Sequence, residues 1–229
     1  MTIEAHAKIN WTLEVGPRRP DGYHSLRSIV LPIALHDTLE FVARPGAITT
    51  NTGYGDKDLI IKAAKALNIT EGYEIRVTKN IPAGGGLGGG SADAAATLKT
   101  LNSLNNLNLP ISALMEIGAT VGSDVPALVY GAPCLMSGRG EVIEPLPREA
   151  DIPVRALQGN GLEFCFPGFA CDTAAVYAEC TPRTEFSSST EPHNDLTAPA
   201  LKLYPELKQY IDDGWHLSGS GSTLFKPVP

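Results

Sequence analysis

The residues from Lys79 to Ala96, KNIPAGGGLGGGSADAAA, hold six glycines between Gly84 and Gly90. Glycine has no Cβ and tolerates positive φ, so consecutive backbone N–H groups can turn toward one anion. A helix that begins near Gly89 would add its unpaired first-turn N–H groups and the positive end of its dipole. The run therefore predicts a loop that holds a phosphate group.

Three other interpretations of the glycine run fit less well. Gly84, Gly86 and Gly89 satisfy the G-x-G-x-x-G pattern of dinucleotide-binding proteins. That pattern also needs an acidic residue about 20 positions later, where this chain has Asn108, Leu109 and Pro110. A Walker A loop ends in Gly-Lys, a pair that occurs nowhere in the sequence. A flexible linker would lack the strand-like stretch before the run and the helical stretch after it.

Phosphoryl transfer also needs a cation and a group that orients or deprotonates the attacking hydroxyl. Lys8 lies in the alternating segment AKIN, and Asp124 lies at the expected start of a short helix in GSDVP. A carboxylate near a lysine stays ionised and can accept a hydroxyl proton. Each residue also has a plainer interpretation, because a strand lysine usually faces solvent and an aspartate at a helix start usually caps it. The residues alone leave both interpretations open.

The hydrophobic pattern predicts which elements position these residues. Alternating residues predict antiparallel strands, and apolar residues at helical spacing predict helices, with Ser112 capping one of them. Residues 138–140 predict a hairpin turn, and the polar stretch 181–194 is the best candidate for disorder. We expect strands over residues 3–15, 25–44, 74–79 and 162–166, and helices over 56–68, from Gly89 onward, and over 112–121, 124–131, 173–180 and 196–211.

Composition and net charge argue against two classes of binding partner. The chain has 229 residues, 43% of them apolar, which suffices for a substantial core. A net charge of −7, with no basic cluster longer than Arg18-Arg19, argues against partners such as nucleic acid or an anionic membrane. No apolar run is long enough to cross a membrane, and the first residues lack a signal-peptide layout. We expect a soluble cytoplasmic protein, or one of the plastid stroma if the chain is a processed eukaryotic form.

The cysteines and histidines predict no metal site. The four cysteines contain no C-x-x-C pair, so we expect reduced thiols rather than disulfides or a zinc site. The five histidines are scattered along the chain, and only His24 lies in a suggestive setting.

The order of short motifs resembles the GHMP kinase family. The motifs, in chain order, are AKIN, RPDGYHSLRS, PAGGGLGGGSADAAATL, GSDVP, GRGE, NDL and LSGSGSTLF. The resemblance implies an α+β fold of two domains. The first is a ribosomal protein S5 domain 2-like, ATP-binding domain over residues 1–149. The second is a ferredoxin-like domain over residues 150–229, which we expect to be shortened because the sequence stops seven residues after Ser222.

DGYH and GGGLGGGS are most similar to family members whose acceptor carries a diphosphocytidyl group. The resemblance implies ATP- and Mg²⁺-dependent phosphorylation of the 2-hydroxyl of a methylerythritol moiety, a step of isoprenoid biosynthesis. It implies that Asp124 deprotonates or orients that hydroxyl, and that Lys8 positions it and lowers its pKa. The partner is then a small-molecule substrate, and the protein a monomer or homodimer.

The resemblance also implies two sets of binding residues. For the nucleotide, Lys79 would lie near the adenine or ribose and Ser91 near the terminal phosphates or Mg²⁺. For the acceptor, Tyr23 and Tyr177 would sandwich the cytosine, and His24 would hydrogen-bond its edge. The nucleotide set is Lys79, Pro82, Gly84, Gly85, Gly86, Leu87, Gly88, Gly89, Gly90 and Ser91. The acceptor set is Asn10, Tyr23, His24, Asp172, Thr173 and Tyr177.

Two residues depart from the family pattern. Ala92 stands where a second serine is common, and Asp58 where an asparagine is common in the adenine-site segment. Two alternatives therefore stay open. One is a GHMP kinase with a different small-molecule acceptor, and the other is a nucleotide-binding module without kinase activity.

Overall fold

The computed structural model describes residues 1–146, 150, 152–153, 156 and 161–228. The chain forms two compact units built from interleaved segments. Unit 1 consists of Met1–Ala7, Leu35–Ile81 and Gly88–Ala132, and unit 2 of Lys8–Ala34, Pro82–Leu87 and Pro133–Pro229. The predicted domain boundary between residues 149 and 150 falls beside residues 147–149, which lie outside the described residues, so it stays a prediction.

The sheet of unit 1 is built on β5 (Glu71–Thr78). The second half of β3 (His24–Ala47) pairs antiparallel with β5, with Leu39 opposite Val77 and Phe41 opposite Ile75. The short strand β4 (Thr49–Thr50) pairs parallel with β5, and β1 (Thr2–Asn10) pairs with β3. Since side chains alternate along each strand, apolar residues fall on one face and charged residues on the other.

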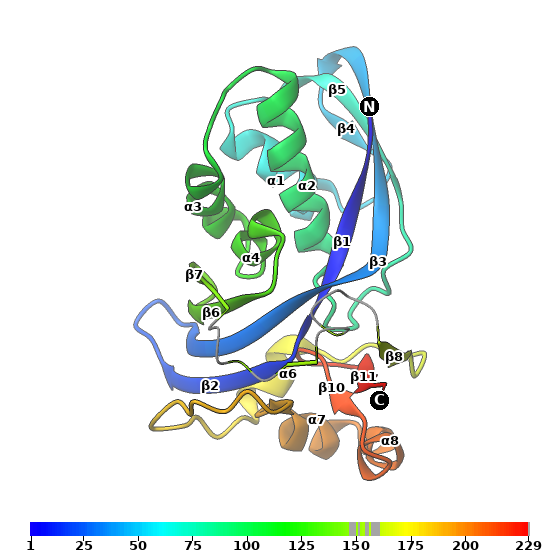
Figure 1. Cartoon of the computed structure of the whole chain (residues 1–229). Helices are drawn as coiled ribbons and strands as arrows, with labels where there is room; N and C mark the ends of the chain where they lie inside the picture. Colours follow the sequence, from blue (N-terminus) through cyan, green and yellow to red (C-terminus); the bar gives the residue numbers. More distant parts are fainter. Residues whose placement is uncertain (147–149, 151, 154–155, 157–160, 229) are drawn as a thin grey trace. The chain divides into compact units, whose positions relative to one another are not determined.

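Helices cover the apolar face of this sheet (Figure 1). They are η1 (Gly55–Lys57), α1 (Leu59–Ala66), α2 (Gly89–Leu104), α3 (Ile111–Val121) and α4 (Val125–Tyr130). Their alanine and leucine side chains pack against buried residues of the strands. The buried residues at this junction include Ala5, Ala7, Leu39, Phe41, Ile75, Val77, Leu98 and Leu101.

Asp58 caps the start of α1. Its carboxylate accepts hydrogen bonds from the backbone N–H of Ile60 (2.9 Å) and from the hydroxyl of Thr50 (2.6 Å). A second hydroxyl, that of Thr52, donates to the same carboxylate oxygen as Thr50 does. A buried charge is tolerated when hydrogen bonds satisfy it. The departure from the family pattern at Asp58 therefore has a structural role within unit 1.

The main sheet of unit 2 contains β2 (Thr12–Arg18), β6 (Cys134–Gly138), β7 (Val142–Pro145) and β9 (His193–Asn194), together with the first half of β3. β3 pairs antiparallel with β2 and β6, while β9 pairs parallel with β2. β6 and β7 form the predicted hairpin. A second, antiparallel sheet has the order β10 (His216–Leu217), β11 (Leu224–Pro227) and β8 (Leu162–Cys165).

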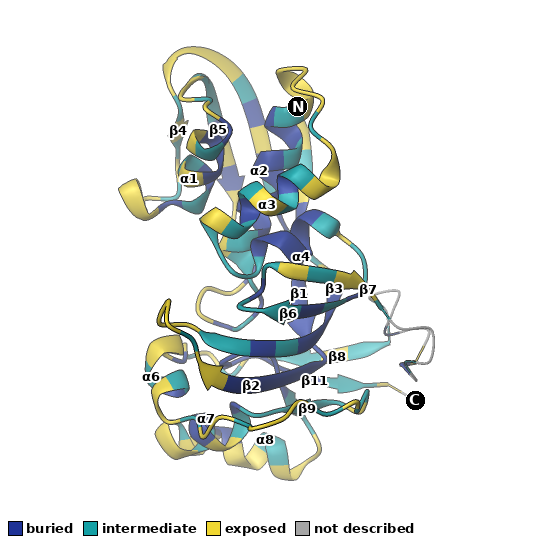
Figure 2. Ribbon diagram, turned by 90° about the vertical axis from the view of Figure 1, so that its left-hand side faces the viewer, coloured by how far each residue is buried: buried dark blue, intermediate teal, exposed yellow. Residues whose placement is uncertain are grey.

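The helices of unit 2 enclose a separate hydrophobic core. Among the described residues of unit 2, the helices in chain order are α6 (Thr173–Ala178), α7 (Thr197–Leu203), η2 (Pro205–Leu207) and α8 (Lys208–Asp212). Figure 2 shows the buried stretch along β2 that faces this core. The core residues include Leu13, Val15, Leu26, Val176, Leu196, Ala200, Leu217 and Leu224.

Some local predictions were wrong. The single helix expected over residues 196–211 is interrupted at Tyr204 and Pro205 and forms α7, η2 and α8 instead. Ser112 does not cap α3, because the helix already begins at Ile111, directly after Pro110. The stretch 181–194 is anchored rather than disordered. Arg183 forms two hydrogen bonds with the carboxylate of Asp195 (2.6 and 2.7 Å) and contacts the buried Glu14. Polar composition does not reveal the buried carboxylate that fixes such a segment.

None of the helices in the described part of the chain is long and apolar enough to cross a membrane.

Candidate active site

Lys8 is buried in unit 2, with 3% of its surface exposed. Its ammonium group donates to Asn10 Oδ1 (2.6 Å) and to the carbonyl oxygen of Gly86 in the glycine run (3.1 Å). Lys8 and Asn10 are two residues apart on β1, so their side chains share one face of the strand. This lysine is therefore held in place by polar partners and is not a solvated surface residue.

Ser28 fixes the orientation of Asn10. The Asn10 amide nitrogen donates to Ser28 Oγ (2.8 Å), which directs the amide oxygen toward Lys8. The sequence analysis did not predict Ser28. Its only signal is its place at the end of the RPDGYHSLRS motif.

The glycines of the loop in unit 2 are required by close packing. A Cβ on Gly86, which has φ +74°, would lie 2.0 Å from the carbonyl oxygen of Ser218. A Cβ on Gly84 would lie 2.6 Å from the Ala170 methyl carbon, and one on Gly85 would lie 2.6 Å from Thr223 Oγ1. The backbone N–H of Thr223 also donates to Gly85 O (3.2 Å). The loop thus packs directly on residues 218–223, which belong to the last motif, LSGSGSTLF.

The start of α2 in unit 1 suits an anion. Gly88, at the N-cap position, has φ +69°, and no side chain caps the helix. Gly89 and Gly90 follow, so Ser91 is the first residue of this 16-residue helix with a side chain. The first-turn N–H groups of a helix and its dipole favour a bound phosphate. The donor set fits the predicted nucleotide.

Asp124 stands at the N-cap position of α4, but its side chain makes no capping hydrogen bond. The plain capping interpretation is therefore not supported. Ser91 Oγ would lie 3.7 Å from a Cβ on Gly122, so the first turn of α2 adjoins the segment that leads into Asp124. Within unit 1 the structure brings Ser91 close to this segment. Lys8 belongs to the other unit.

Lys79 joins two buried carboxylates of unit 1. Its ammonium group forms ion pairs with Asp37 and with Asp93 Oδ2 (2.8 Å), and about a third of its side chain, 33%, is exposed. Asp37 Oδ1 also accepts from the backbone N–H of Ile81 (2.9 Å). The cluster ties the segment after β5 to the first turn of α2. The sequence analysis assigned no role to Asp37 or Asp93.

Asp93 has an unusual pKa. Burial, assisted by the neighbouring Asp37, raises the pKa of Asp93 to about 7, although Lys79 opposes the shift. Asp93 Oδ1 has no hydrogen-bond partner among the described residues. Burial lowers the pKa of Lys79, but its hydrogen bonds and charge pairing with the two carboxylates outweigh that effect, so its net shift is upward.

All six predicted acceptor residues lie in unit 2, and three of them carry rings. Tyr23 is 50% exposed, and the guanidinium of Arg139 lies 5.0 Å from its ring centroid. His24 Nδ1 lies 3.0 Å from the carbonyl oxygen of Gly16. Since a carbonyl only accepts, Nδ1 donates this hydrogen bond, which leaves Nε2 for another partner. The rings of His24 and Tyr177 lie 5.9 Å apart, so the structure brings these two predicted residues together.

Asp172 and Thr173 both form contacts at the start of α6. Asp172 Oδ1 accepts from the backbone N–H of Ala175 (2.8 Å), which makes it the N-cap. The Thr173 hydroxyl lies 2.8 Å from the hydroxyl of Ser220 in the last motif, LSGSGSTLF. Both residues are exposed. Their predicted contact with the acceptor stays a prediction.

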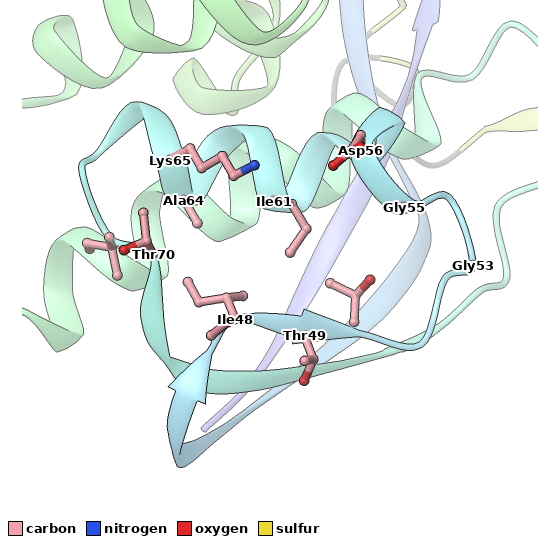
Figure 3. A pocket seen from close by; sticks show the side chains of 12 residues that line it. Ile48, Thr49, Gly53, Gly55, Asp56, Ile61, Ala64, Lys65 and Thr70 are labelled. Atoms are coloured by element: carbon pink, nitrogen blue, oxygen red, sulfur yellow. The ribbon is translucent and has the colours of Figure 1, made fainter.

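A pocket of about 570 Å³ lies in unit 1 between β4 and α1 (Figure 3). Its apolar wall comes from Ile48, Ile61 and Ala64, and Lys65 and Asp56 are polar lining residues. None of the predicted nucleotide or acceptor residues lines this pocket. We therefore assign it no part in the reaction.

Comparison with known proteins defines the class. Residues 58–132 match the model of the GHMP kinases N-terminal domain. A curated protein from Thermodesulfovibrio yellowstonii is 36% identical, over 98% of this chain and 88% of that protein. The crystal structure of the Methanococcus jannaschii mevalonate kinase shares the fold, with a TM-score of 0.65 and 17% sequence identity. The match covers 100% of this chain and 90% of the mevalonate kinase chain. The chain belongs to the GHMP kinase family, and the predicted α+β GHMP kinase fold is confirmed.

Within the family, one kind of kinase recurs among the similar proteins. The Thermodesulfovibrio relative is named 4-diphosphocytidyl-2-C-methyl-D-erythritol kinase. A relative from Geobacillus thermodenitrificans with the same name is 42% identical, over 98% of this chain and 87% of that protein. A crystal structure of 4-(cytidine 5'-diphospho)-2C-methyl-D-erythritol kinase matches with a TM-score of 0.80 and 31% sequence identity. The match covers 99% of this chain and 90% of the chain in that crystal structure. The resemblance predicted from the motifs is confirmed.

The packing of Gly86 generates a stability prediction. Gly86→Ala should lower the free energy of unfolding by at least about 3 kcal/mol, from the backbone clash with Ser218 and the left-handed conformation. Gly90→Ala is the control, because its Cβ would meet only Leu59 Cδ1 at 3.5 Å. Urea unfolding followed by circular dichroism measures both variants. Equal losses in the two variants would contradict the packing argument.

The raised pKa of Asp93 predicts a pH-dependent stability. A carboxyl whose pKa rises from 3.8 to about 7 on folding stabilises the fold fully below pH 3.8 and progressively less as the pH rises toward 7. The wild type should therefore lose stability relative to Asp93→Asn between pH 5 and pH 8, measured by urea unfolding. Glu141→Gln is the control, because the pKa of Glu141 is lowered from 4.5 and its titration lies below this range. A pH-independent difference for Asp93→Asn would refute the assignment.

Proposed function

We propose that this chain transfers the γ-phosphoryl group of ATP to the 2-hydroxyl of 4-diphosphocytidyl-2-C-methyl-D-erythritol, in the methylerythritol phosphate route to isoprenoids. Relatives that carry this kinase name match 98% of the chain. The observation that carries the proposal is the buried Lys8, hydrogen-bonded to Asn10 and to Gly86 of the glycine run. A fixed positive charge thus contacts the loop that we propose binds the nucleotide.

The start of α2 would hold the nucleotide phosphates. ATP supplies the phosphoryl group, and Mg²⁺ offsets its charge. Because Gly89 and Gly90 have no side chains, a phosphate can approach their backbone N–H groups closely. The Ser91 hydroxyl is an oxygen donor of the kind that Mg²⁺ binds, and it would hold the ion or a terminal phosphate.

Asp124 and Lys8 would divide the chemistry at the acceptor hydroxyl. The Asp124 carboxylate accepts the hydroxyl proton as the oxygen bonds to phosphorus and the bond to the ADP oxygen breaks. Lys8 stabilises the negative charge that develops on the acceptor oxygen. Asn10 holds the Lys8 ammonium group in one position, which reduces the rearrangement needed during the reaction.

Tyr23 and His24 would recognise the cytosine. The half-exposed ring of Tyr23 offers a stacking surface, and Arg139 restrains it from one side. With Nδ1 donating to Gly16 O, His24 Nε2 would receive a hydrogen bond from the cytosine amino group. Tyr177 contacts His24 and would help to orient it.

The two departures from the family pattern do not favour an inactive binding module. Asp58 is used as a helix cap, with three hydrogen-bond donors on its carboxylate. Ala92 is buried in α2, with 2% of its surface exposed, so a hydroxyl at this position would also be buried. The proposed substrate is a charged, water-soluble nucleotide, so we propose that the enzyme acts in the cytoplasm.

Variants of Lys8 and Asp124 test the proposed chemistry. Asp124→Asn and Lys8→Met should each lower kcat by about 10² to 10⁴-fold, measured as ADP release in a coupled assay with the diphosphocytidyl acceptor. The double variant should be much less impaired than the product of the single effects, because both groups act on one hydroxyl. Asp56→Asn and Lys62→Met, both at exposed positions of unit 1, should retain wild-type turnover. Unchanged turnover in Asp124→Asn would refute the assigned base.

A variant of Tyr23 distinguishes this acceptor from those of other GHMP kinases. Tyr23→Ala should raise KM for the diphosphocytidyl acceptor by about 5 to 150-fold, the range expected for loss of a base stack, without changing KM for ATP. Tyr23→Phe should behave like the wild type. Tyr54→Ala, which removes another exposed tyrosine, is the control. If KM for the acceptor were unchanged in Tyr23→Ala, cytosine stacking on this ring would be wrong.

A further inference from the structure

Three side chains of types that can ligate a metal lie close together on unit 1, two of them exposed and one partly buried. Glu4 and His6 lie on β1, and His36 lies on the neighbouring strand β3. Within the described part of the chain, these residues form a group whose ligand atoms all lie within 4.8 Å of one another. None of the three belongs to the proposed kinase site.

The distances between the donor atoms suit one small ion. Glu4 Oε2 lies 3.2 Å from His6 Nε2, and Glu4 Oε1 lies 3.6 Å from His36 Nε2. A tetrahedral zinc ion with bonds of about 2.0–2.1 Å holds its ligand atoms roughly 3.3–3.4 Å apart. Each imidazole thus lies about as far from one Glu4 oxygen as two zinc ligands lie from each other, and the three ligand atoms lie within 4.8 Å of one another.

The strand geometry fixes the direction of these side chains. Glu4 and His6 alternate with Ala5 and Ala7, which are buried beneath the helices. A strand whose other face is buried cannot reverse its side chains without exposing the core. The side chains of Glu4 and His6 therefore lie on the same exposed face of β1.

Open space adjoins the cluster on the side of Glu4 and His6. A depression of about 510 Å³ is lined by these two residues and by Thr2, Ile3 and Thr38, while His36 is not among its lining residues. The side chain of Glu4 is 58% exposed, that of His6 47% and that of His36 33%, so an ion can reach all three. A site of two histidines and one carboxylate leaves the fourth zinc position open to water.

We propose that Glu4, His6 and His36 form a binding site for one divalent transition-metal ion of the zinc type, which clasps β1 to β3. Two imidazoles and one carboxylate favour zinc, copper or nickel over the oxygen-seeking magnesium and calcium. The ion would bind the folded chain and so stabilise unit 1. The sequence analysis expected no metal site, because His6 and His36 are far apart in the chain and match no ligand spacing.

Calorimetric titration with zinc chloride tests the proposal. The full chain, without a polyhistidine tag, is stripped with a chelator and dialysed, and circular dichroism confirms that each variant is folded. The wild type should bind one equivalent of zinc and unfold at a higher temperature with it. His6→Ala and His36→Ala should each weaken zinc binding at least tenfold, while Glu40→Gln, an exposed carboxylate of β3, should not.

Cobalt spectra identify the ligands. Cobalt(II) bound to the wild type should show tetrahedral bands without the thiolate charge-transfer bands that the free cysteines would produce. The proposal is overturned if the wild type binds no zinc, or if the His6→Ala/His36→Ala double variant binds it as tightly as the wild type. Kinase turnover should be the same in both proteins, so this outcome does not depend on the proposed reaction.

Discussion

The carbonyl group of Gly86 is the constraint on which unit 2 depends. It accepts hydrogen bonds from the ammonium group of Lys8 (3.1 Å) and from the hydroxyl of Ser218 (3.1 Å). No side chain fits at this position, because its Cβ would overlap the Ser218 backbone. One peptide group thus joins the first, third and last motifs of the sequence. The glycine run is required by this packing as well as by any phosphate that it binds.

In unit 1, ion pairs and hydrogen bonds stabilise buried carboxylates. The carboxylates of Asp37 and Asp93 share the ammonium group of Lys79, and Asp58 is satisfied by hydroxyl and backbone donors. Breaking a buried ion pair leaves an uncompensated charge, which costs several kcal/mol, about 3–5 in measured cases. These contacts hold the start of α2 in place, where the proposed phosphate contacts lie. Different residues near the start of α2 therefore hold the helix in position and make the proposed phosphate contacts.

Several of these elements could be predicted from the sequence, because they depend on residues that are close together in the chain. The strand before the glycine run, the helix after it and the short helix after Asp124 all follow from hydrophobic spacing and from the residues at their ends. The partners of these elements could not be predicted. Ser28, Asp37 and Arg139 contact site residues that are distant in sequence, and no spacing rule connects them. The same limit hid the convergence of Glu4, His6 and His36 on one face of a sheet.

The central claim is that this chain phosphorylates a diphosphocytidyl alcohol. Mass spectrometry of the products from ATP and 4-diphosphocytidyl-2-C-methyl-D-erythritol tests it most directly, with mevalonate and homoserine as alternative acceptors. Our account predicts one added phosphate on the methylerythritol part of the first acceptor and none on the other two. Phosphorylation of mevalonate or homoserine instead, or no phosphorylated product from any acceptor, would contradict it.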